Sequence, residues 1–293
     1  MTVVLAVESA TDAAGVAVAD DSGLLAAMTV GRGRRHAETI APAVAAVCRS
    51  GGVELADLTA VAVDVGPGLF TGLRVGIATA TGLAFALGVP VVPVLSLDVL
   101  AAAAAAVPYP ARSLVAVVDA RRGEVFWAWY QPDPGVGAEE TTTLNPAGAA
   151  SAPAGAAGAA GAAVGPSGTA MGSAGADGRA DEHGAVRSSV LDGVPPRTHE
   201  PRVGPPEAVA AEMASRAAIG PAPVALGDGA RRYADVLIAS GGAVAGPFLA
   251  HPPVAALAGI GVARAAAGQV AAPEAVSACY LRDADARINW ERR

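Results

Sequence analysis

Between residues 60 and 107 the chain alternates short β-branched runs with longer stretches of helical periodicity. The extended runs are 61–65 and 89–94, and the helical stretches are 73–87 and 97–106. Parallel strands joined by helices need crossover connections, which cover the faces of the sheet. The alternation therefore predicts an α/β fold with a mostly parallel sheet.

Three extended runs precede this region and predict an antiparallel meander. They cover residues 3–7, 15–19 and 24–30 and are separated by polar turns that carry acidic residues. Apolar residues then recur at helical spacing over 34–49, before a Gly-Gly pair, and predict a helix. We expect a first lobe that spans residues 1–107.

The opening pattern returns at residue 114. A strand at 114–118, a polar turn with Asp119, and a strand at 125–130 repeat the strand, acidic turn and strand of the N-terminus. This repeat predicts two related lobes, the second spanning 108–293. The later elements expected in it are a strand at 224–226 and helices at 206–218, 231–239 and 254–267.

Ala, Gly, Ser and Pro make up nearly all of residues 147–180. No Phe, Trp or Tyr stands between Tyr130 and Tyr233. Such a segment buries too little apolar area to offset the entropy lost on ordering it. A flexible insertion is predicted at about residues 138–205.

The charge balance argues against a chain that binds nucleic acid unaided. All 20 basic residues are Arg, and 27 acidic residues leave a net charge of −7. Phosphate binding depends on a basic field that releases counterions. Any RNA would therefore be held mainly by a partner.

The two cysteines, Cys48 and Cys279, are far apart and lack metal-ligand spacing, as expected in a reducing compartment. The N-terminus has no basic region and reaches an acid at Glu8, which argues against a secretory signal. No run of about 18 apolar residues lacks both charge and Pro. We expect a cytoplasmic protein without membrane contact.

The segment Gly66–Arg74 reads Gly-Pro-Gly-Leu-Phe-Thr-Gly-Leu-Arg and joins a strand to a helix. One interpretation is an anion site, in which Gly66, Gly68 and Thr71 surround free N–H groups at the helix start. The other is a tight turn that docks the helix on the sheet. The segment lacks the Lys of a P-loop and the GxGxxG spacing, so both interpretations stay open.

The helix behind this turn carries Gly72, Gly76, Ala80 and Ala84 at intervals of four residues. They form a ridge with almost no side chain, which permits close approach of another element. That element is either the sheet or the 34–49 helix of the same chain, or a second subunit.

Few residues offer catalytic chemistry. Glu8 and Asp119 end the first strands of the two lobes and are expected at one cleft, either as metal-binding or basic carboxylates or as turn formers. His36 has Ile40 four residues later, so no two-His metal face exists, and His36 is interpreted as a surface or interface residue. No GxSxG elbow occurs. The residues by themselves make no case for catalysis.

Five segments resemble the TsaB (YeaZ) family, in order and at suitable spacing, and GPGxFTGLR is the specific one. They cover about residues 1–131 and, thinly, 224–282. The segments are 5–11, 35–38, 66–74, 119–125 and 279–282. The resemblance implies the actin-like, sugar-kinase-like (ASKHA) fold of two RNase-H-type lobes, and a role in making threonylcarbamoyladenosine (t6A) in tRNA.

The resemblance also implies a non-catalytic scaffold that binds and activates the TsaD transferase, helps to recruit the TsaE ATPase, and forms a homodimer when alone. Transfer RNA would be contacted only through the complex, and ATP or ADP with Mg²⁺ only at a subunit boundary. Ile40 stands where TsaD has a second metal histidine, and Glu8 where Asp is more usual. The residues expected at the interface are His36, Ile40, Gly72, Arg74, Gly76, Ala80 and Ala84.

The alternative is an enzyme, an ATP-binding phosphotransferase or hydrolase of the actin-like superfamily. It would use Glu8, Asp119 and the 66–71 loop around Mg-ATP. We rank it second because the chain has no Lys to neutralise phosphates.

Overall fold

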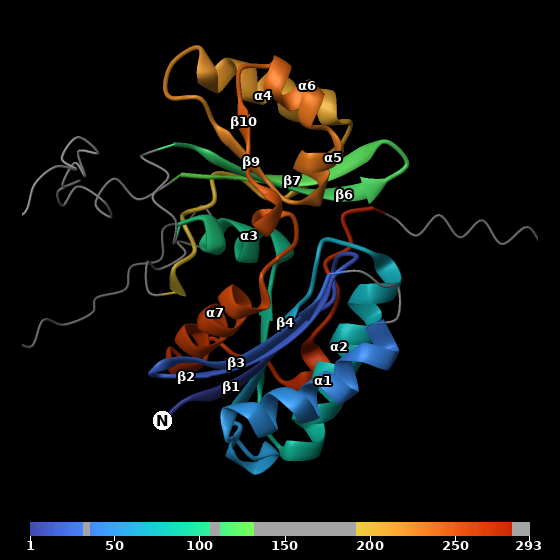
Figure 1. The fold of residues 1–293 in the computed structure, drawn as a ribbon, viewed down its shortest axis with the longest axis vertical. Helices are drawn as coiled ribbons and strands as arrows, with labels where there is room; N and C mark the ends of the chain where they lie inside the picture. Colours follow the sequence, from blue (N-terminus) through green and yellow to red (C-terminus); the bar gives the residue numbers. More distant parts are fainter. Residues whose placement is uncertain (32–35, 106–111, 132–191, 283–293) are drawn as a thin grey trace, which may run out of the picture. The chain divides into compact units, whose positions relative to one another are not determined.

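The computed structural model describes residues 1–31, 36–105, 112–131 and 192–282 (Figure 1). The first of its two sheets has the strand order β3-β2-β1-β4-β5. Strand β1 pairs antiparallel with β2 and parallel with β4, so the predicted meander and the predicted parallel strands belong to one mixed sheet. The strands are β1 Val3–Glu8, β2 Ala14–Asp20, β3 Gly23–Val30, β4 Ala60–Asp64 and β5 Val91–Val94.

The second sheet has the order β10-β9-β6-β7-β8 and repeats the topology of the first. Its first strand, β6, pairs antiparallel with β7 and parallel with β9. The repeat expected from the sequence is thus present in the strand order, and the α/β fold class is confirmed. The strands are β6 Leu114–Arg121, β7 Glu124–Tyr130, β8 Arg202–Gly204, β9 Val224–Leu226 and β10 Ala243–Val244.

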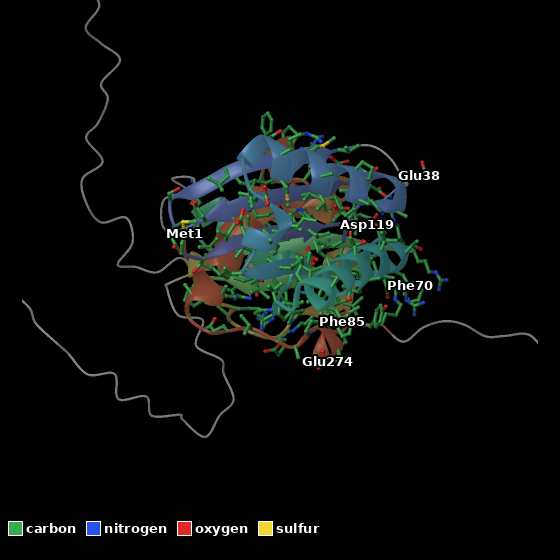
Figure 2. The ribbon with its side chains drawn as sticks, turned by 90° about the horizontal axis from the view of Figure 1, so that it is seen from below. Met1, Glu38, Phe70, Phe85, Asp119 and Glu274 are labelled. Atoms are coloured by element: carbon green, nitrogen blue, oxygen red, sulfur yellow. The ribbon has the colours of Figure 1, made fainter. Side chains whose placement is uncertain are left out.

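Helices cover both faces of the first sheet. Helices α1 and α2 lie side by side on one face (Figures 1 and 2), where they pack on alternate residues such as Leu5 and Val7. Helix α7 packs on the other face, against Val4 and Ala6. Helices α4, α5 and α6 pack on the second sheet. The helices are α1 His36–Gly51, α2 Phe70–Leu87, α3 Ser96–Ala105, α4 Pro206–Ala217, α5 Asp228–Arg232, α6 Ala234–Ala239 and α7 Val254–Ala266.

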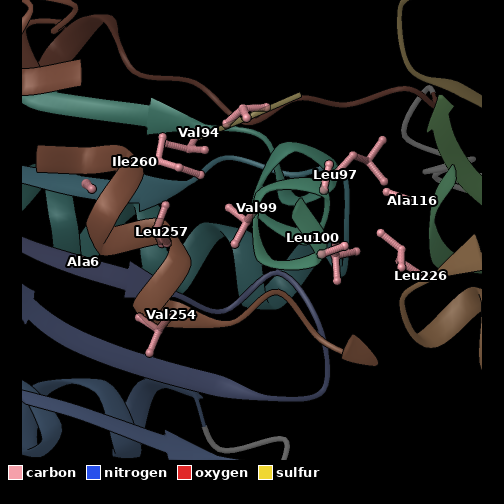
Figure 3. Close-up of a cluster of buried hydrophobic side chains, with 14 of the residues drawn as sticks. Ala6, Val94, Leu97, Val99, Leu100, Ala116, Leu226, Val254, Leu257 and Ile260 are labelled. Atoms are coloured by element: carbon pink, nitrogen blue, oxygen red, sulfur yellow. The ribbon is translucent and has the colours of Figure 1, made fainter. Parts of the chain in front are cut away.

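The last helix that follows each sheet packs against the other sheet. Helix α3 follows β5 but contacts β6, β7 and β9, whereas α7 follows β10 but contacts β1, β2, β4 and β5. Figure 3 shows Leu97 and Leu100 of α3 near Ala116 and Leu226 of the second sheet. One continuous apolar core therefore serves both sheets.

Two expectations about element boundaries are wrong. The predicted insertion runs too far, because β8 lies inside it and pairs with β7, and Val194 is buried nearby. The expected 231–239 helix is two helices, α5 and α6, which meet at Tyr233. The rest of the predicted insertion, 138–191, and the predicted lobe boundary at residue 107 lie outside the described residues.

Candidate functional site

Two buried carboxyl groups lie side by side at the carboxyl ends of the paired strands β1 and β4. Glu8 and Asp64 are each 1% exposed. Glu8 Oε1 accepts the Ala10 N–H at 2.8 Å. Asp64 Oδ1 accepts the Gly66 N–H and the Ser96 hydroxyl, both at 2.7 Å. The first and fourth strands thus place an acid pair in the interior of the chain.

Burial disfavours the ionised form of both carboxyl groups. Burial raises the pKa of Glu8 well above its ordinary value, and the charge of Asp64 raises it further. Burial also raises the pKa of Asp64, while hydrogen bonds from Glu8, Ser96 and Gly66 oppose that rise. Two buried carboxyl groups in contact cannot both ionise cheaply. The larger rise in pKa makes Glu8 the member of the pair that favours its neutral form.

A second polar cluster joins the β1–β2 turn to the end of β6. Arg121 contacts Asp119 Oδ2 at 3.0 Å through Nη1 and Asp12 Oδ2 at 2.8 Å through Nη2. Arg232 Nη1 approaches Asp119 Oδ2 at 3.4 Å. The placement of Glu8 and Asp119 at one cleft stays a prediction; Glu8 interacts with Asp64, and Asp119 is bound by two guanidinium groups. Arginine side chains thus supply positive charge beside these carboxylates, of which Asp119 is buried.

The backbone at Arg121 adopts a strained conformation. Arg121 has a φ of 62° and Arg122 a φ of 57°, in the left-handed region that side chains other than Gly seldom adopt. A register shift between Asp119 and Arg121 interrupts the β6–β7 pairing at the same point. Such bulges redirect side chains. The strained hairpin presents Arg121 to Asp12 on the other lobe.

Two more contacts complete this polar layer. Asp228, at the start of α5, accepts the Asp119 backbone N–H at 3.0 Å, and burial raises the pKa of Asp228. His251 Nδ1 lies 3.0 Å from the Thr11 hydroxyl. Among the described residues, no group of three or more His, Cys, Asp or Glu could hold a metal ion. The layer is built to join two lobes.

The glycine-led turn before α2 packs closely against the β1–β2 turn. A Cβ added to Gly68 would lie 2.2 Å from the Ala10 carbonyl oxygen. The same oxygen accepts the Leu69 N–H at 2.7 Å, and the Gly66 carbonyl accepts the Ser96 N–H at 2.9 Å. A carbonyl oxygen facing Gly68 would repel an anion. These contacts favour the docking-turn interpretation over the anion site proposed for Gly66, Gly68 and Thr71.

The small-residue ridge of α2 is covered by the chain itself. A Cβ added to Gly72 would lie 2.1 Å from the Ser9 carbonyl oxygen, and one added to Gly76 would lie 2.2 Å from Ser9 Oγ. Ala80 and Ala84 are fully buried. The expectation that this ridge meets a second subunit is wrong, because the β1–β2 turn and the first sheet already occupy it.

The expected interface residues on α1 are also buried within the chain. His36 is 7% exposed and Ile40 1% exposed. The His36 ring lies 3.2 Å from the position that a Cβ of Gly72 would take. Their assignment to a partner surface is wrong for the same steric reason. Of the seven residues expected at an interface, Arg74 is exposed.

The opposite face of α2 is apolar and open to solvent. Phe85 is 79% exposed and Phe70 47% exposed, near the two ends of the helix (Figure 2). Ala78 and Gly82, between them, are exposed as well. By length and mean hydropathy (1.4 over 18 residues) α2 could cross a membrane, although 28% of that stretch is buried inside the fold. The sequence placed the partner surface on the small-residue ridge rather than on this face.

Comparisons with known proteins agree with these motifs. Residues 27–139 match the family described as TsaD: tRNA N6-adenosine threonylcarbamoyltransferase. The chain is 38% identical over 130 residues to tRNA threonylcarbamoyladenosine biosynthesis protein TsaB of Escherichia coli, covering 44% of this chain and 55% of that protein. It is 30% identical over 128 residues to TsaB of Buchnera aphidicola, covering 44% of this chain and 60% of that protein. The chain thus spans just over half the length of these curated relatives.

Solved structures extend the similarity across the fold. YeaZ from Pseudomonas aeruginosa superposes with a TM-score of 0.65 at 23% identity, covering 96% of this chain and all of that one. A second Pseudomonas aeruginosa structure, described as similar to peptidase YEAZ, gives 0.66 at 25% identity with the same coverage. The expected actin-like, sugar-kinase-like architecture is confirmed. Shared sequence over 44% of this chain and a shared fold over both lobes make the chain similar to proteins of the TsaB (YeaZ) family.

Proposed function

We propose that this chain is a subunit of the machinery that makes t6A in tRNA, and that it acts as a non-catalytic scaffold. It binds and activates a TsaD-type transferase through the exposed face of α2. The names of its TsaB relatives support the pathway. The observation that carries the docking role is the pair of exposed aromatic side chains, Phe70 and Phe85, on the face of α2 that also exposes Ala78 and Gly82.

Burial of this face would release substantial free energy. Full burial of a Phe side chain contributes roughly 1.5–3 kcal/mol, and Phe85 is 79% exposed before any partner binds. Exposed aromatic groups on a rigid helix are typical anchors of protein interfaces. The small residues between them let a partner helix approach closely. The docking surface is therefore the face opposite the one that the sequence suggested.

Two features support a non-catalytic role. Burial and the charge of Asp64 raise the pKa of Glu8, which makes a negatively charged Glu8 ligand for Mg²⁺ unfavourable. Arg121 neutralises Asp12 and Asp119, where the enzyme hypothesis would place a cation. ATP or ADP with Mg²⁺ would therefore bind only at a subunit boundary. It further includes recruitment of a TsaE ATPase, contact with tRNA only in the complex, a homodimer through α2 when alone, and a cytoplasmic location.

Phe85→Glu tests the docking role, with Phe248→Glu as its control. Both side chains are exposed, at 79% and 94%, so neither change disturbs the core, but Phe248 lies on the second lobe between β10 and α7. Loss of about 2 kcal/mol should weaken binding to the TsaD protein of the same organism about 30-fold in calorimetric titration, while the control binds normally. Wild-type affinity in Phe85→Glu would reject docking through α2.

Nucleotide binding tests the non-catalytic role. The isolated chain should bind Mg-ATP no tighter than millimolar in calorimetric titration and should not turn it over. Micromolar affinity with Mg²⁺-dependent hydrolysis, lost in Glu8→Ala, would instead favour the phosphotransferase or hydrolase.

A further inference from the structure

Arg74 is the sole charged residue of α2, and it lies on the exposed face. Its guanidinium carbon stands 3.8 Å from the centre of the Phe70 ring. Its Nε donates to the Tyr280 hydroxyl at 3.3 Å. The Phe70 and Tyr280 rings are themselves 5.6 Å apart. Two side chains far apart in the sequence, Phe70 and Tyr280, thus fix the orientation of this guanidinium group.

Arg74 lacks a carboxylate partner within the part of the chain that the structure describes. Six other arginines do have one: Arg121, Arg197, Arg202, Arg232, Arg264 and Arg282. Since Nε is bound by Tyr280, the two terminal NH₂ groups of Arg74 remain to donate. A stacked guanidinium with two free donors matches the paired oxygens of a carboxylate.

We propose that Arg74 determines partner specificity by receiving an Asp or Glu side chain of the docking protein, between the anchors Phe70 and Phe85. This inference rests on the proposed docking role of α2. A chain with a net charge of −7 repels acidic partners at long range. A single oriented cation on an apolar face attracts a carboxylate at that one position, and this pairing fixes the register in which the partner docks. The occupant is therefore an apolar helix face that carries one carboxylate.

Affinity for the TsaD protein, measured at about 50 and 300 mM salt, tests the inference. Arg74→Gln should bind about 10-fold more weakly at the lower salt and should lose most of the salt dependence. Arg74→Glu should bind about 100-fold more weakly, because it opposes like charges. Arg74→Lys should keep the salt dependence with reduced affinity, since an ammonium group cannot pair in the same planar geometry.

Arg216→Gln is the matched control. Arg216 also stacks on an aromatic ring, 4.2 Å from Trp129, but it lies on α4 in the second lobe. This variant should bind with wild-type affinity and salt dependence. An equal loss in Arg74→Gln and Arg216→Gln would assign the effect to net charge and would overturn the inference.

The remaining outcomes separate this inference from the docking role. If Phe85→Glu abolishes binding while Arg74→Gln binds as wild type at both salts, the carboxylate is rejected and docking through α2 stands. If neither variant affects binding, the docking role itself is rejected. If Arg74→Gln weakens tRNA binding by the complex but leaves TsaD affinity unchanged, Arg74 contacts RNA phosphate and the inference is overturned. Thermal unfolding of each variant confirms that it is folded.

Discussion

Replacing Gly72 by Ala should destabilise the protein, although Ala is the better helix former. The added Cβ would lie 2.1 Å from the Ser9 carbonyl oxygen, where ordinary contacts begin at 3.4 Å. The Ser9 hydroxyl also donates to the Gly72 carbonyl at 2.9 Å, which fixes α2 against the β1–β2 turn. Backbone atoms cannot rotate away as a flexible side chain could, so the helix must shift by more than about 1 Å.

The magnitude follows from two opposing effects. Ala gains roughly 1 kcal/mol over Gly in a helix interior. Overpacking of this kind costs about 1–3 kcal/mol, and a backbone clash this close belongs at or beyond the upper end. A net loss of about 2 kcal/mol is expected. Gly82 is the matched control, since a Cβ there meets nothing within 4 Å. Gly82→Ala should gain roughly 0.5–1 kcal/mol.

Urea unfolding followed by circular dichroism measures both variants. The two should differ by nearly 3 kcal/mol in the free energy of unfolding, with Gly72→Ala below and Gly82→Ala above the wild type. At about 2–4 °C per kcal/mol, Gly72→Ala should melt roughly 4–8 °C lower. A Gly72→Ala protein as stable as Gly82→Ala would refute the close packing of α2 on the β1–β2 turn.

Two further predictions concern the polar clusters. The pKa of Glu8 is raised in the folded protein. Its contribution to the free energy of unfolding is complete at pH values below the unfolded pKa of about 4.3, and it is lost as the pH rises through the folded pKa. Glu8→Gln does not titrate, so its urea midpoint should fall less than that of wild type above about pH 5. Equal falls in the two proteins would contradict the raised pKa of Glu8. Arg121→Gly and Arg121→Ala both lose the pairs with Asp12 and Asp119, but Gly accepts a φ of 62°, so the Gly variant should be more stable by about 1 kcal/mol. An Ala variant of equal stability would contradict the strain.

Local periodicity was enough to predict most of the fold. The β-branched runs of β1, β4 and β6 alternate with polar turns, and this pattern predicted an α/β fold of two related lobes; that the meander and the parallel strands form one mixed sheet came from the structure. Strand β8 could not be predicted in this way. It has three residues, lies in a Pro-rich stretch and pairs with β7 across some seventy intervening residues. Its conformation comes from that pairing rather than from local propensity.

The site was harder to predict because its contacts are long-range. The spacing of Gly72 and Gly76 shows that the ridge is bare, but the atom that covers it belongs to Ser9, 63 residues from Gly72. Asp64 was taken as part of a strand interior, which concealed its position beside Glu8. The exposed face of α2 did leave a signal. Phe70 and Phe85 are large apolar residues placed away from the small-residue ridge.

Helices α3 and α7 each pack on the sheet of the other lobe, and this arrangement affects the order in which the protein folds during synthesis. The first sheet is translated by residue 94, but the apolar face formed by Val4, Ala6 and Ala62 is covered only by α7, which ends at residue 266. A nascent chain leaving the ribosome must therefore carry an uncovered hydrophobic surface through most of its translation. The lobe that is made first is therefore completed last.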